Sequence, residues 1–591
     1  MNLHPIELLS YSTKGSFMIS LQKRQDKLKK HLQKQGLKLS SLQQKRLILG
    51  LSVFALLVAS QILKGFFLEF IALFIALPIF LFFFKKSRRH QDFIDQLKKL
   101  SRFYKHQQKL HKGESFFGEI TAETINPDLV RDLDLQELSV ALDFSFSKEG
   151  KKLFNSWIGQ KFSNSSFEDR HAQIKELSKF PGLLRRVHSN KPKKLVSFEI
   201  IQKEINRSFL DHNPLWKWLI PISWIALILC LFIGVPSIFW KTSLFIYLAS
   251  SLFYFSISKD IFSRLQDLLS ELEKLKPQFS PLSRLAQNLS FTPQLKSLSP
   301  QKNTTELTRL VSLMSIKSNP ILFYILNAIV PWNFILTERC ERSRLKISKS
   351  FNLWSQELIQ IEAVSSFSNL YTYHQTVWPL KSEHNHLKVK NISHPLINQS
   401  TVVKNTFSQE DGKSIFIITG SNMSGKSTFL RAIGINFCLA KIGAPVFAES
   451  FEFPDYDIVS CIRVSDSLRD GQSYFYAEVR RMKTILESAK ERPILFLIDE
   501  PLRGTNNRER LLGNQSYLEQ ILETNSIGFA STHDLELTQL ADISPRVDNY
   551  HFTEDWKEKD LYFNYLIQDG PSKSTNALKI LEKEGLYNGL S

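Results

Sequence analysis

Residues 419–431 read Thr-Gly-Ser-Asn-Met-Ser-Gly-Lys-Ser-Thr-Phe-Leu-Arg, and this stretch decides the fold of the last third of the chain. It follows the strand-like run Ile-Phe-Ile-Ile at 415–418 and opens a helical pattern. G-x-x-x-x-G-K-S between a strand and a helix is the arrangement of a phosphate-binding loop. Its glycines allow a tight turn, so that backbone N–H groups and the helix N-terminus face the phosphates. The stretch predicts a parallel α/β P-loop domain at 386–591.

Every residue of this loop is a candidate for binding the phosphates of ATP. The candidates are Gly420, Ser421, Asn422, Met423, Ser424, Gly425, Lys426, Ser427 and Thr428. Lys426 would place its charge between the β- and γ-phosphates, and the Ser427 hydroxyl would ligate Mg²⁺. ATP and Mg²⁺ are therefore the expected cofactors.

Two further strand ends carry polar residues. The apolar run at 494–498 ends at Asp499 and Glu500, and the run at 527–531 is followed closely by His533. Ligands bind at the carboxyl ends of parallel strands, so Asp499 is predicted to hold Mg²⁺ and Glu500 to polarise the attacking water. His533 would contact the γ-phosphate, which makes Lys426, Glu500 and His533 the catalytic candidates. The alternatives are an acidic pair that only caps a loop and a structural histidine.

A small polar loop, formed by Gly471, Gln472 and Ser473, opens a charged helix. It precedes Asp499 by the interval at which ATP-binding-cassette ATPases carry the loop that caps the ATP of the opposite subunit. The spacing predicts a homodimer with ATP sandwiched at its interface. An ordinary surface loop is the alternative.

Taken together, these motifs resemble the MutS mismatch-repair family. The resemblance rests on the phosphate loop with Asn422 and Met423, the acid pair followed by Arg503-Gly504-Thr505, and the segments 473–475, 531–534 and 394–395. It covers 391–585 and, more faintly, 132–157. It implies that His394, Pro395 and Leu396 lie near the adenine and that Ser473 and Asn422 help complete the partner's ATP site. It also implies binding of double-stranded DNA, mismatched or branched, as in DNA mismatch repair.

The chain departs from the family pattern in several places. Pro501 and Leu502 stand where the family usually has Leu-Gly, a difference that would alter the flexibility of this loop and the ATPase rate. A mismatch-reading amino-terminal domain is not evident, and 259–385 leaves little room for a DNA clamp. The basic residues of that segment could contact phosphates, although a solvated helix face is favoured; they are Arg339, Arg342, Arg344, Lys346 and Lys349.

Composition sets the limits on these interpretations. Hydrophobic residues make up 43% and charged residues 23% of 591 residues, which excludes wholesale disorder. The formal net charge of +19 favours an anionic partner, either nucleic acid or phospholipid. Four cysteines without CxxC spacing argue against a disulfide framework or a structural zinc site and indicate a reduced, intracellular protein.

Two pairs of apolar runs, at 47–84 and 215–257, predict transmembrane helical hairpins. The length of each run is close to that of an α-helix that crosses a bilayer, about 20 residues. Basic residues on both flanks place the soluble parts in the cytoplasm, so the expected location is the cell (inner or plasma) membrane, with multiple spans. Membrane phospholipid becomes an expected partner. Fully buried helices in a large soluble core are the alternative.

The predicted organisation follows from these segments. It comprises a basic helical segment (1–46), a first hairpin (47–84), a basic helix (85–113), a helical core-like segment (114–210), a second hairpin (215–257), helical levers (259–385) and the ATPase domain (386–591). Helices are expected at 133–158 and 166–179, and interruptions at 277–281 and 319–320.

The sequence thus predicts a membrane-anchored, dimeric MutS-like ATPase that acts on double-stranded DNA. The alternative is a membrane-tethered, ATP-driven scaffold or switch that acts on a protein or lipid partner. A half-transporter of the ATP-binding-cassette type is disfavoured, because such a chain has about six contiguous spans ahead of its ATPase domain, whereas some 130 residues separate the two hairpins here.

Overall fold

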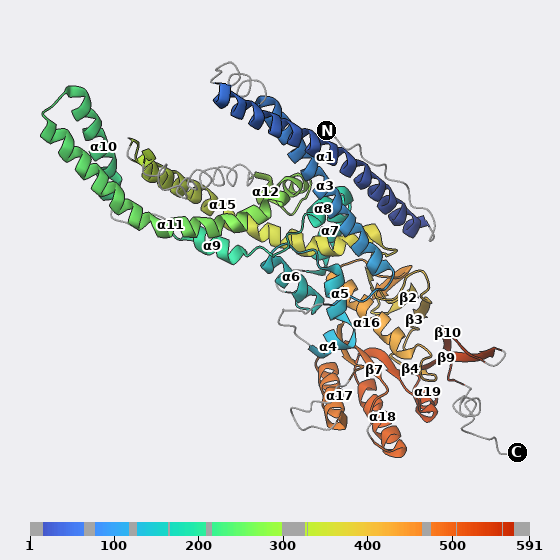
Figure 1. Cartoon of the computed structure of the whole chain (residues 1–591). Helices are drawn as coiled ribbons and strands as arrows, with labels where there is room; N and C mark the ends of the chain where they lie inside the picture. The colour runs from blue at the N-terminus through green and yellow to red at the C-terminus, as the bar shows by residue number, and fades with distance from the viewer. Residues whose placement is uncertain are drawn as a thin grey trace. The chain divides into compact units, whose positions relative to one another are not determined.

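The computed structural model describes most of the chain. The described residues are 16–63, 77–117, 127–162, 166–208, 215–297, 325–327, 329–463, 474–503, 505–557 and 560–572. Figure 1 shows their helices and strands. The chain divides into two compact units. The first unit comprises Met1–Asp143, Asn155–Ser178 and Phe367–Ser591, and the second comprises Phe144–Phe154 and Lys179–Ser366.

A six-stranded sheet organises the carboxyl-terminal part of the first unit, in the order β10-β9-β4-β8-β7-β6. Its strands are β4 (Ile415–Thr419), β6 (Asp457–Cys461), β7 (Ile494–Asp499), β8 (Ile527–Ser531), β9 (Val547–Lys557) and β10 (Asp560–Asp569). All neighbouring strands are parallel except β9 and β10. The central strands β4 and β8 are buried along their whole length, as expected where helices cover both faces of a parallel sheet.

A second sheet of four short strands completes the β structure described in this unit. Its order is β1 (Leu380–Lys381), β5 (Ser450–Phe453), β2 (Lys388–Ile392) and β3 (Asn405–Ser408). The helices of the unit are α1 (Ser16–Leu63), α3 (Leu77–His111), α4 (Pro127–Asp132), α5 (Leu135–Leu142), α7 (Phe167–Ser178), α16 (Lys426–Ile442), α17 (Tyr474–Glu491), α18 (Asn507–Leu522), the 3₁₀ helix η3 (Leu535–Gln539) and α19 (Leu540–Ile543).

The second unit is helical in its described residues. It contains α8 (Pro181–Ser189), α9 (Phe198–Asn206), α10 (Leu215–Ile233), α11 (Ser237–Ala286) and α12 (Pro293–Ser297), while α6 (Lys148–Ile158) and α15 (Trp332–Tyr373) contribute residues to both units. The buried Glu362 carboxylate accepts hydrogen bonds from the backbone N–H groups of Phe146 and Ser147, both at 2.8 Å. It therefore joins α15 to the chain that enters α6.

The helix expected at 133–158 is divided into pieces. Asp134 has φ +53°, a left-handed conformation that ends α4 before α5 begins. Further along, Ser147 forms an isolated bridge with Val196, which keeps the segment before α6 extended. The helix expected at 166–179 agrees with α7.

The interruption predicted at 277–281 is wrong, because α11 continues through Pro277 and Pro281. Proline at 281 has no N–H to donate to the carbonyl of Pro277, four residues earlier. The Asn190 side-chain amide donates to that carbonyl at 3.4 Å and replaces the missing bond. The interruption predicted at 319–320 lies outside the described residues.

The two predicted transmembrane hairpins are wrong. Among the described residues, no helix combines the length and the apolarity needed to cross a bilayer, and residues 64–76 of the first hairpin lie outside that part of the chain. The apolar end of α1 follows a long polar stretch, and α3 becomes polar at Lys85. Helix α10 has 19 residues and includes Lys217 and Pro221, so its apolar stretch falls short of about 20 residues. The same finding overturns the predicted multi-pass location in the cell membrane and the prediction of a membrane-anchored protein.

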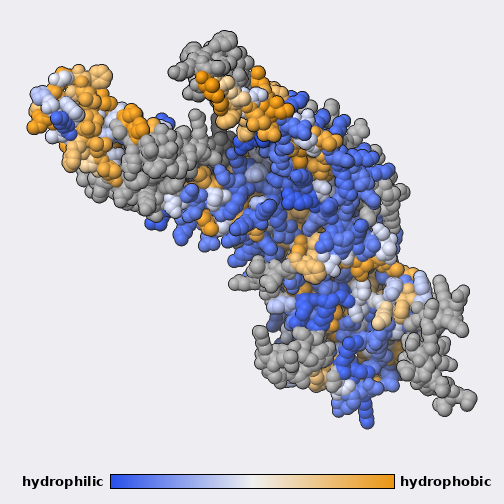
Figure 2. Space-filling view, in the orientation of Figure 1, coloured by the Kyte–Doolittle hydropathy of each residue, from blue (hydrophilic) through white to orange (hydrophobic). Residues whose placement is uncertain are grey.

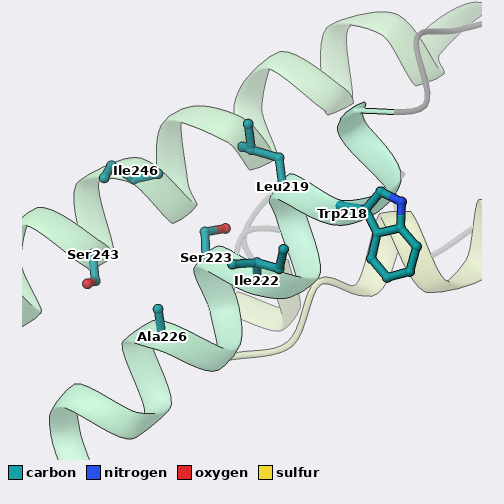
Figure 3. Close-up of a pocket in the computed structure, with 7 residues that line it drawn as sticks. All are labelled: Trp218, Leu219, Ile222, Ser223, Ala226, Ser243 and Ile246. Carbon is teal, nitrogen blue, oxygen red and sulfur yellow. The ribbon is translucent and has the colours of Figure 1, made fainter.

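Apolar side chains nevertheless gather on α10 and the first part of α11 (Figure 2). Trp218, Phe232 and Phe245 are all more than two-thirds exposed. A pocket of about 440 Å³ lies between these helices and is lined by Trp218, Leu219, Ile222, Ser223, Ala226, Ser243 and Ile246 (Figure 3). None of these residues is among those that the sequence assigns to nucleotide binding.

Candidate nucleotide site

The candidate site is built at the carboxyl ends of β4, β7 and β8. Strand β8 lies between the other two, with Ser531 in register with both Ile418 and Asp499. The Thr532 N–H donates to the Ile418 carbonyl at 2.9 Å, and the Glu500 N–H donates to the Ser531 carbonyl at 3.0 Å. These bonds carry the pairing past the strand ends, so the three segments that follow the strands leave the sheet at one edge.

The phosphate loop between β4 and α16 depends on left-handed backbone conformations. Gly420 has φ +142°, Met423 has φ +70° and Gly425 has φ +114°. Only glycine adopts the first and last of these without steric cost. Helix α16 begins at Lys426, directly after Gly425. The hydroxyl of Ser424 is buried in this loop and finds no hydrogen-bond partner among the described residues.

Lys426 is buried, and its ammonium group bonds to the loop itself. It donates to the carbonyl oxygens of Gly420 at 2.8 Å and Ser421 at 2.9 Å. The same Nζ atom lies 3.9 Å from Oε1 of Glu500. Burial lowers the pKa of Lys426 to about 8, against the opposing effect of the Asp499 charge, so the side chain stays protonated at pH 7.

His533 lies at the centre of the predicted catalytic residues. Its Nε2 atom is 2.6 Å from Oε1 of Glu500, 2.9 Å from Oδ1 of Asn422 and 3.5 Å from Nζ of Lys426. Burial lowers the pKa of His533, and the positive charges of Lys426 and Arg503 lower it further. The imidazole is therefore neutral at pH 7, and its ring N–H can donate to the Glu500 carboxylate.

The turn after β7 holds Glu500 in an unusual backbone conformation. Glu500 has φ +49° and Leu502 has φ +61°, the left-handed region that non-glycine residues seldom occupy. The Leu502 side chain is buried in the main core cluster of the sheet, and the Arg503 guanidinium forms an ion pair with Glu500. The unusual Pro501-Leu502 pair thus anchors the turn in the core. The effect of the Pro501-Leu502 pair on the ATPase rate stays a prediction.

Ser427 and Asp499 supply the kind of ligands that Mg²⁺ requires. Both offer oxygen atoms, and the Asp499 carboxylate accepts a hydrogen bond from the Ser531 hydroxyl. Within the described residues, no three His, Cys, Asp or Glu side chains gather as a metal site. Mg²⁺ is commonly held by one or two protein oxygens together with substrate phosphates and water, and Ser427 and Asp499 can supply such oxygens.

The predicted adenine-proximal residues are His394, Pro395 and Leu396. His394 is buried, and its Nε2 atom lies 4.0 Å from Oδ2 of Asp134. The same Asp134 oxygen accepts a hydrogen bond from Arg431 at 3.1 Å, and Nε of Arg431 donates to the Ser427 carbonyl at 3.2 Å. Burial lowers the pKa of His394 to about 4. A chain of contacts therefore joins His394 to the first turns of α16.

The buried acid Asp132 near α17 is not identified by the sequence analysis. It is fully buried and accepts hydrogen bonds from the Ser460 hydroxyl at 2.9 Å and from the N–H groups of Ile462 at 2.9 Å and Arg463 at 3.1 Å. It also pairs with the guanidinium of Arg481 on α17. Nothing in the local pattern around Asp132 signals this role, since all its partners lie more than 300 positions away in the sequence.

Some predicted residues are not placed by the structure. Gly471, Gln472 and Ser473 of the trans signature loop, together with Gly504, lie outside the described residues. Asn422, expected to help complete the partner's site, contacts His533 of its own chain.

The basic residues of α15 are not a continuous exposed stripe. Arg344 is buried and pairs with Glu341 at 2.6 Å. Arg339, Arg342 and Lys346 are exposed. The suggested contact of Arg344 with a nucleic acid phosphate is therefore wrong.

Comparison with known proteins relates the carboxyl-terminal region to the MutS family. Residues 416–588 match MutS domain V. The chain is 31% identical over 248 residues to the DNA mismatch repair protein MutS of Thermus thermophilus, which is 42% of this chain and 30% of that protein. It is 29% identical over 240 residues to MutS of Halalkalibacterium halodurans, 40% of this chain and 28% of that protein. The chain thus spans less than a third of the length of these relatives.

Proposed function

Proceeding from a carboxyl-terminal region that is similar to MutS, we propose that this chain is an ATPase that binds and hydrolyses ATP with Mg²⁺. One observation carries the proposal: Lys426, Glu500 and His533, from the segments that follow three different strands, lie within 4 Å of one another beside the phosphate loop. Such a convergence of a cation, a carboxylate and an imidazole at a phosphate-binding loop suits phosphoryl transfer to water.

In this proposal each residue has a defined task. The loop N–H groups and Lys426 bind the β- and γ-phosphates. To do so, the Lys426 ammonium group gives up its hydrogen bonds to the loop carbonyls and bonds to the phosphates instead. Ser427 and Asp499 hold Mg²⁺, which neutralises charge on the phosphates when bound. Glu500 accepts a proton from the attacking water, and His533 orients the water or the γ-phosphate. Asn422 accepts from the His533 ring and so holds the imidazole in place when Glu500 engages the water.

Two substitutions test the proposal. Lys426→Ala is expected to abolish ATP binding, whereas Glu500→Gln is expected to retain binding and to lower kcat by at least about a hundredfold. Lys483→Ala, at an exposed position of α17, is the matched control and should leave both quantities unchanged. Turnover that is equal in all three purified variants would end the ATPase proposal.

We further propose that the chain acts as a homodimer on double-stranded DNA, mismatched or branched. The similarity to proteins named DNA mismatch repair protein MutS supports this step. The test is to measure the ATPase rate with homoduplex, mismatched and branched DNA. DNA should change the rate, and this change should disappear at high salt, because salt weakens contacts to DNA phosphates. An ATPase that ignores every DNA would instead favour a switch acting on a protein partner.

A further inference from the structure

The β9–β10 hairpin lies directly against the phosphate loop. The carbonyl oxygen of Phe552 on β9 is 2.9 Å from the position that a Cβ atom on Gly420 would take. The ring of Tyr565 on β10 approaches the corresponding position on Gly425 to 3.3 Å. The hairpin therefore covers both glycines of the loop, and a side chain at Gly420 would collide with the Phe552 carbonyl.

Glu554 extends this contact to the loop side chains. Strand β9 pairs with β4 as far as Thr419 opposite His551, so the residues that follow His551 run alongside the loop. Glu554 lies two positions beyond Phe552, on the same face of the strand. Its side chain is buried, and its carboxylate accepts a hydrogen bond from the hydroxyl of Ser421.

This places a buried carboxylate beside the proposed phosphate site. Ser421, which donates its hydroxyl to Glu554, also accepts a hydrogen bond through its carbonyl from Lys426 at 2.9 Å. Only one loop residue thus separates the carboxylate from the ammonium group assigned to the phosphates. A negative charge in so poorly solvated a place interacts more strongly with charged ligands than it would in water.

We propose that Glu554 determines the nucleotide affinity of this site by opposing the negative charge of the phosphates. The inference rests on the proposed ATP-binding function. Lys426 and the loop N–H groups attract the polyphosphate, and the Glu554 carboxylate subtracts from that attraction. Its hydrogen bond to Ser421 fixes the carboxylate in place, so the repulsion persists when a nucleotide enters. The site consequently binds nucleotides more weakly than the phosphate loop alone would.

The test is a calorimetric titration of the full chain with MgADP and with the magnesium complex of a non-hydrolysable ATP analogue. Glu554→Gln removes the charge and keeps an oxygen that can accept from Ser421. It is expected to bind both nucleotides about tenfold more tightly than the wild type. Glu523→Gln, at an exposed position after α18, removes a charge of the same kind and should bind as the wild type does.

Two further variants separate charge from hydrogen bonding. Glu554→Ala, which also serves if the glutamine variant does not fold, should tighten binding in the same direction. Ser421→Ala keeps the charge of Glu554 but frees its carboxylate, so it should tighten binding by less than Glu554→Gln does. Tightening by Ser421→Ala equal to that of Glu554→Gln would assign the effect to the hydrogen bond and overturn the inference.

The inference and the proposed function fail in different ways. A wild type that binds nucleotide, together with a Glu554→Gln variant that binds equally or more weakly, overturns the inference alone. An absence of nucleotide binding in the wild type and in every Glu554 variant overturns both.

Discussion

The Nε2 atom of His533 lies 2.6 Å from Oε1 of Glu500, although the two residues follow different strands of the sheet. The contact exists because β7 and β8 are parallel neighbours that end in register, with Asp499 opposite Ser531. The left-handed conformation of Glu500 then begins the turn immediately after the strand. A proton shared at this contact would couple the protonation of the proposed base to the position of the histidine.

His533→Ala should lower kcat for ATP hydrolysis by about ten- to a hundredfold, a usual range for the loss of one group that orients or transfers a proton. Nucleotide affinity should change little, because Lys426 and the loop N–H groups remain. Single-turnover hydrolysis and nucleotide titration give the two quantities separately. His551→Ala, on β9, is the control, because its ring bonds to the Gly570 carbonyl. A large loss of affinity with unchanged kcat would contradict this assignment.

Arg510 is expected to position His533 through Asp534. Its guanidinium donates two hydrogen bonds to the Asp534 carboxylate, at 2.7 Å and 2.6 Å, and the N–H of Asp534 donates to the Thr532 hydroxyl. Arg510→Met should lower kcat several-fold with little change in nucleotide affinity, because a bidentate pair fixes geometry as well as charge. Arg510→Asp and Asp534→Arg should each lower kcat, and combining these two substitutions should restore part of the lost rate. Purely additive effects in this double-mutant cycle would show that the pair does not act as a unit.

Asp132→Ala should lower the free energy of unfolding by about 3–5 kcal/mol, the usual cost of removing one partner of a buried ion pair. The variant leaves the mostly buried Arg481 without its carboxylate and the N–H groups of Ile462 and Arg463 without their acceptor. Urea unfolding measures the loss. Asp128→Ala removes a half-exposed carboxylate 3.6 Å from the same arginine and should cost less than about 1 kcal/mol. Equal losses in the two variants would contradict the assigned role of Asp132.

Acid should destabilise the first unit through His374. This side chain is buried beside His111 and bonds to Gln107 at 3.0 Å, and burial lowers its pKa to about 3. The unfolded chain binds a proton near pH 6.5 while the folded chain does not, so stability is present above pH 6.5 and declines as the pH falls toward 3. Between pH 7 and pH 5 this amounts to about 2 kcal/mol.

The measurement is urea unfolding at both pH values for the wild type and for His374→Gln. The variant should lose about 2 kcal/mol less between pH 7 and pH 5 than the wild type. His394, also buried with a lowered pKa, remains in both proteins and cancels in the comparison. An identical pH dependence in the two proteins would show that His374 is not the group responsible.

The sequence predicts the parts of the site that depend on strand ends. Parallel strands bring their carboxyl ends to one edge, so the convergence of Lys426, Glu500 and His533 could be anticipated without knowing the strand order. Arg510 with Asp534, and Ser421 with Glu554, could not be anticipated. Each pair depends on which elements happen to pack together, and a single sequence carries no local signal for such a choice.

Hydropathy predicts the structure less reliably than the strand-end pattern does. Apolar composition over 215–257 predicted a membrane hairpin, although composition alone does not fix where a helix begins or what surrounds it. Proline was equally misleading in α11, because the cost of a missing N–H depends on whether another donor is near, and here Asn190 provides one for Pro277. The break at Asp134 reflects a backbone conformation rather than a residue type that ends helices by itself.

The two prolines of α11 give that helix an uneven stiffness. Pro277 and Pro281 are four residues apart, so both gaps in the backbone ladder open on one face of the helix. We therefore expect this 50-residue helix to bend most easily at the two prolines and in one direction. The side chain that bonds to the helix at this position, Asn190, comes from the end of α8. The bending stiffness of α11 at the prolines therefore depends on a residue outside the helix.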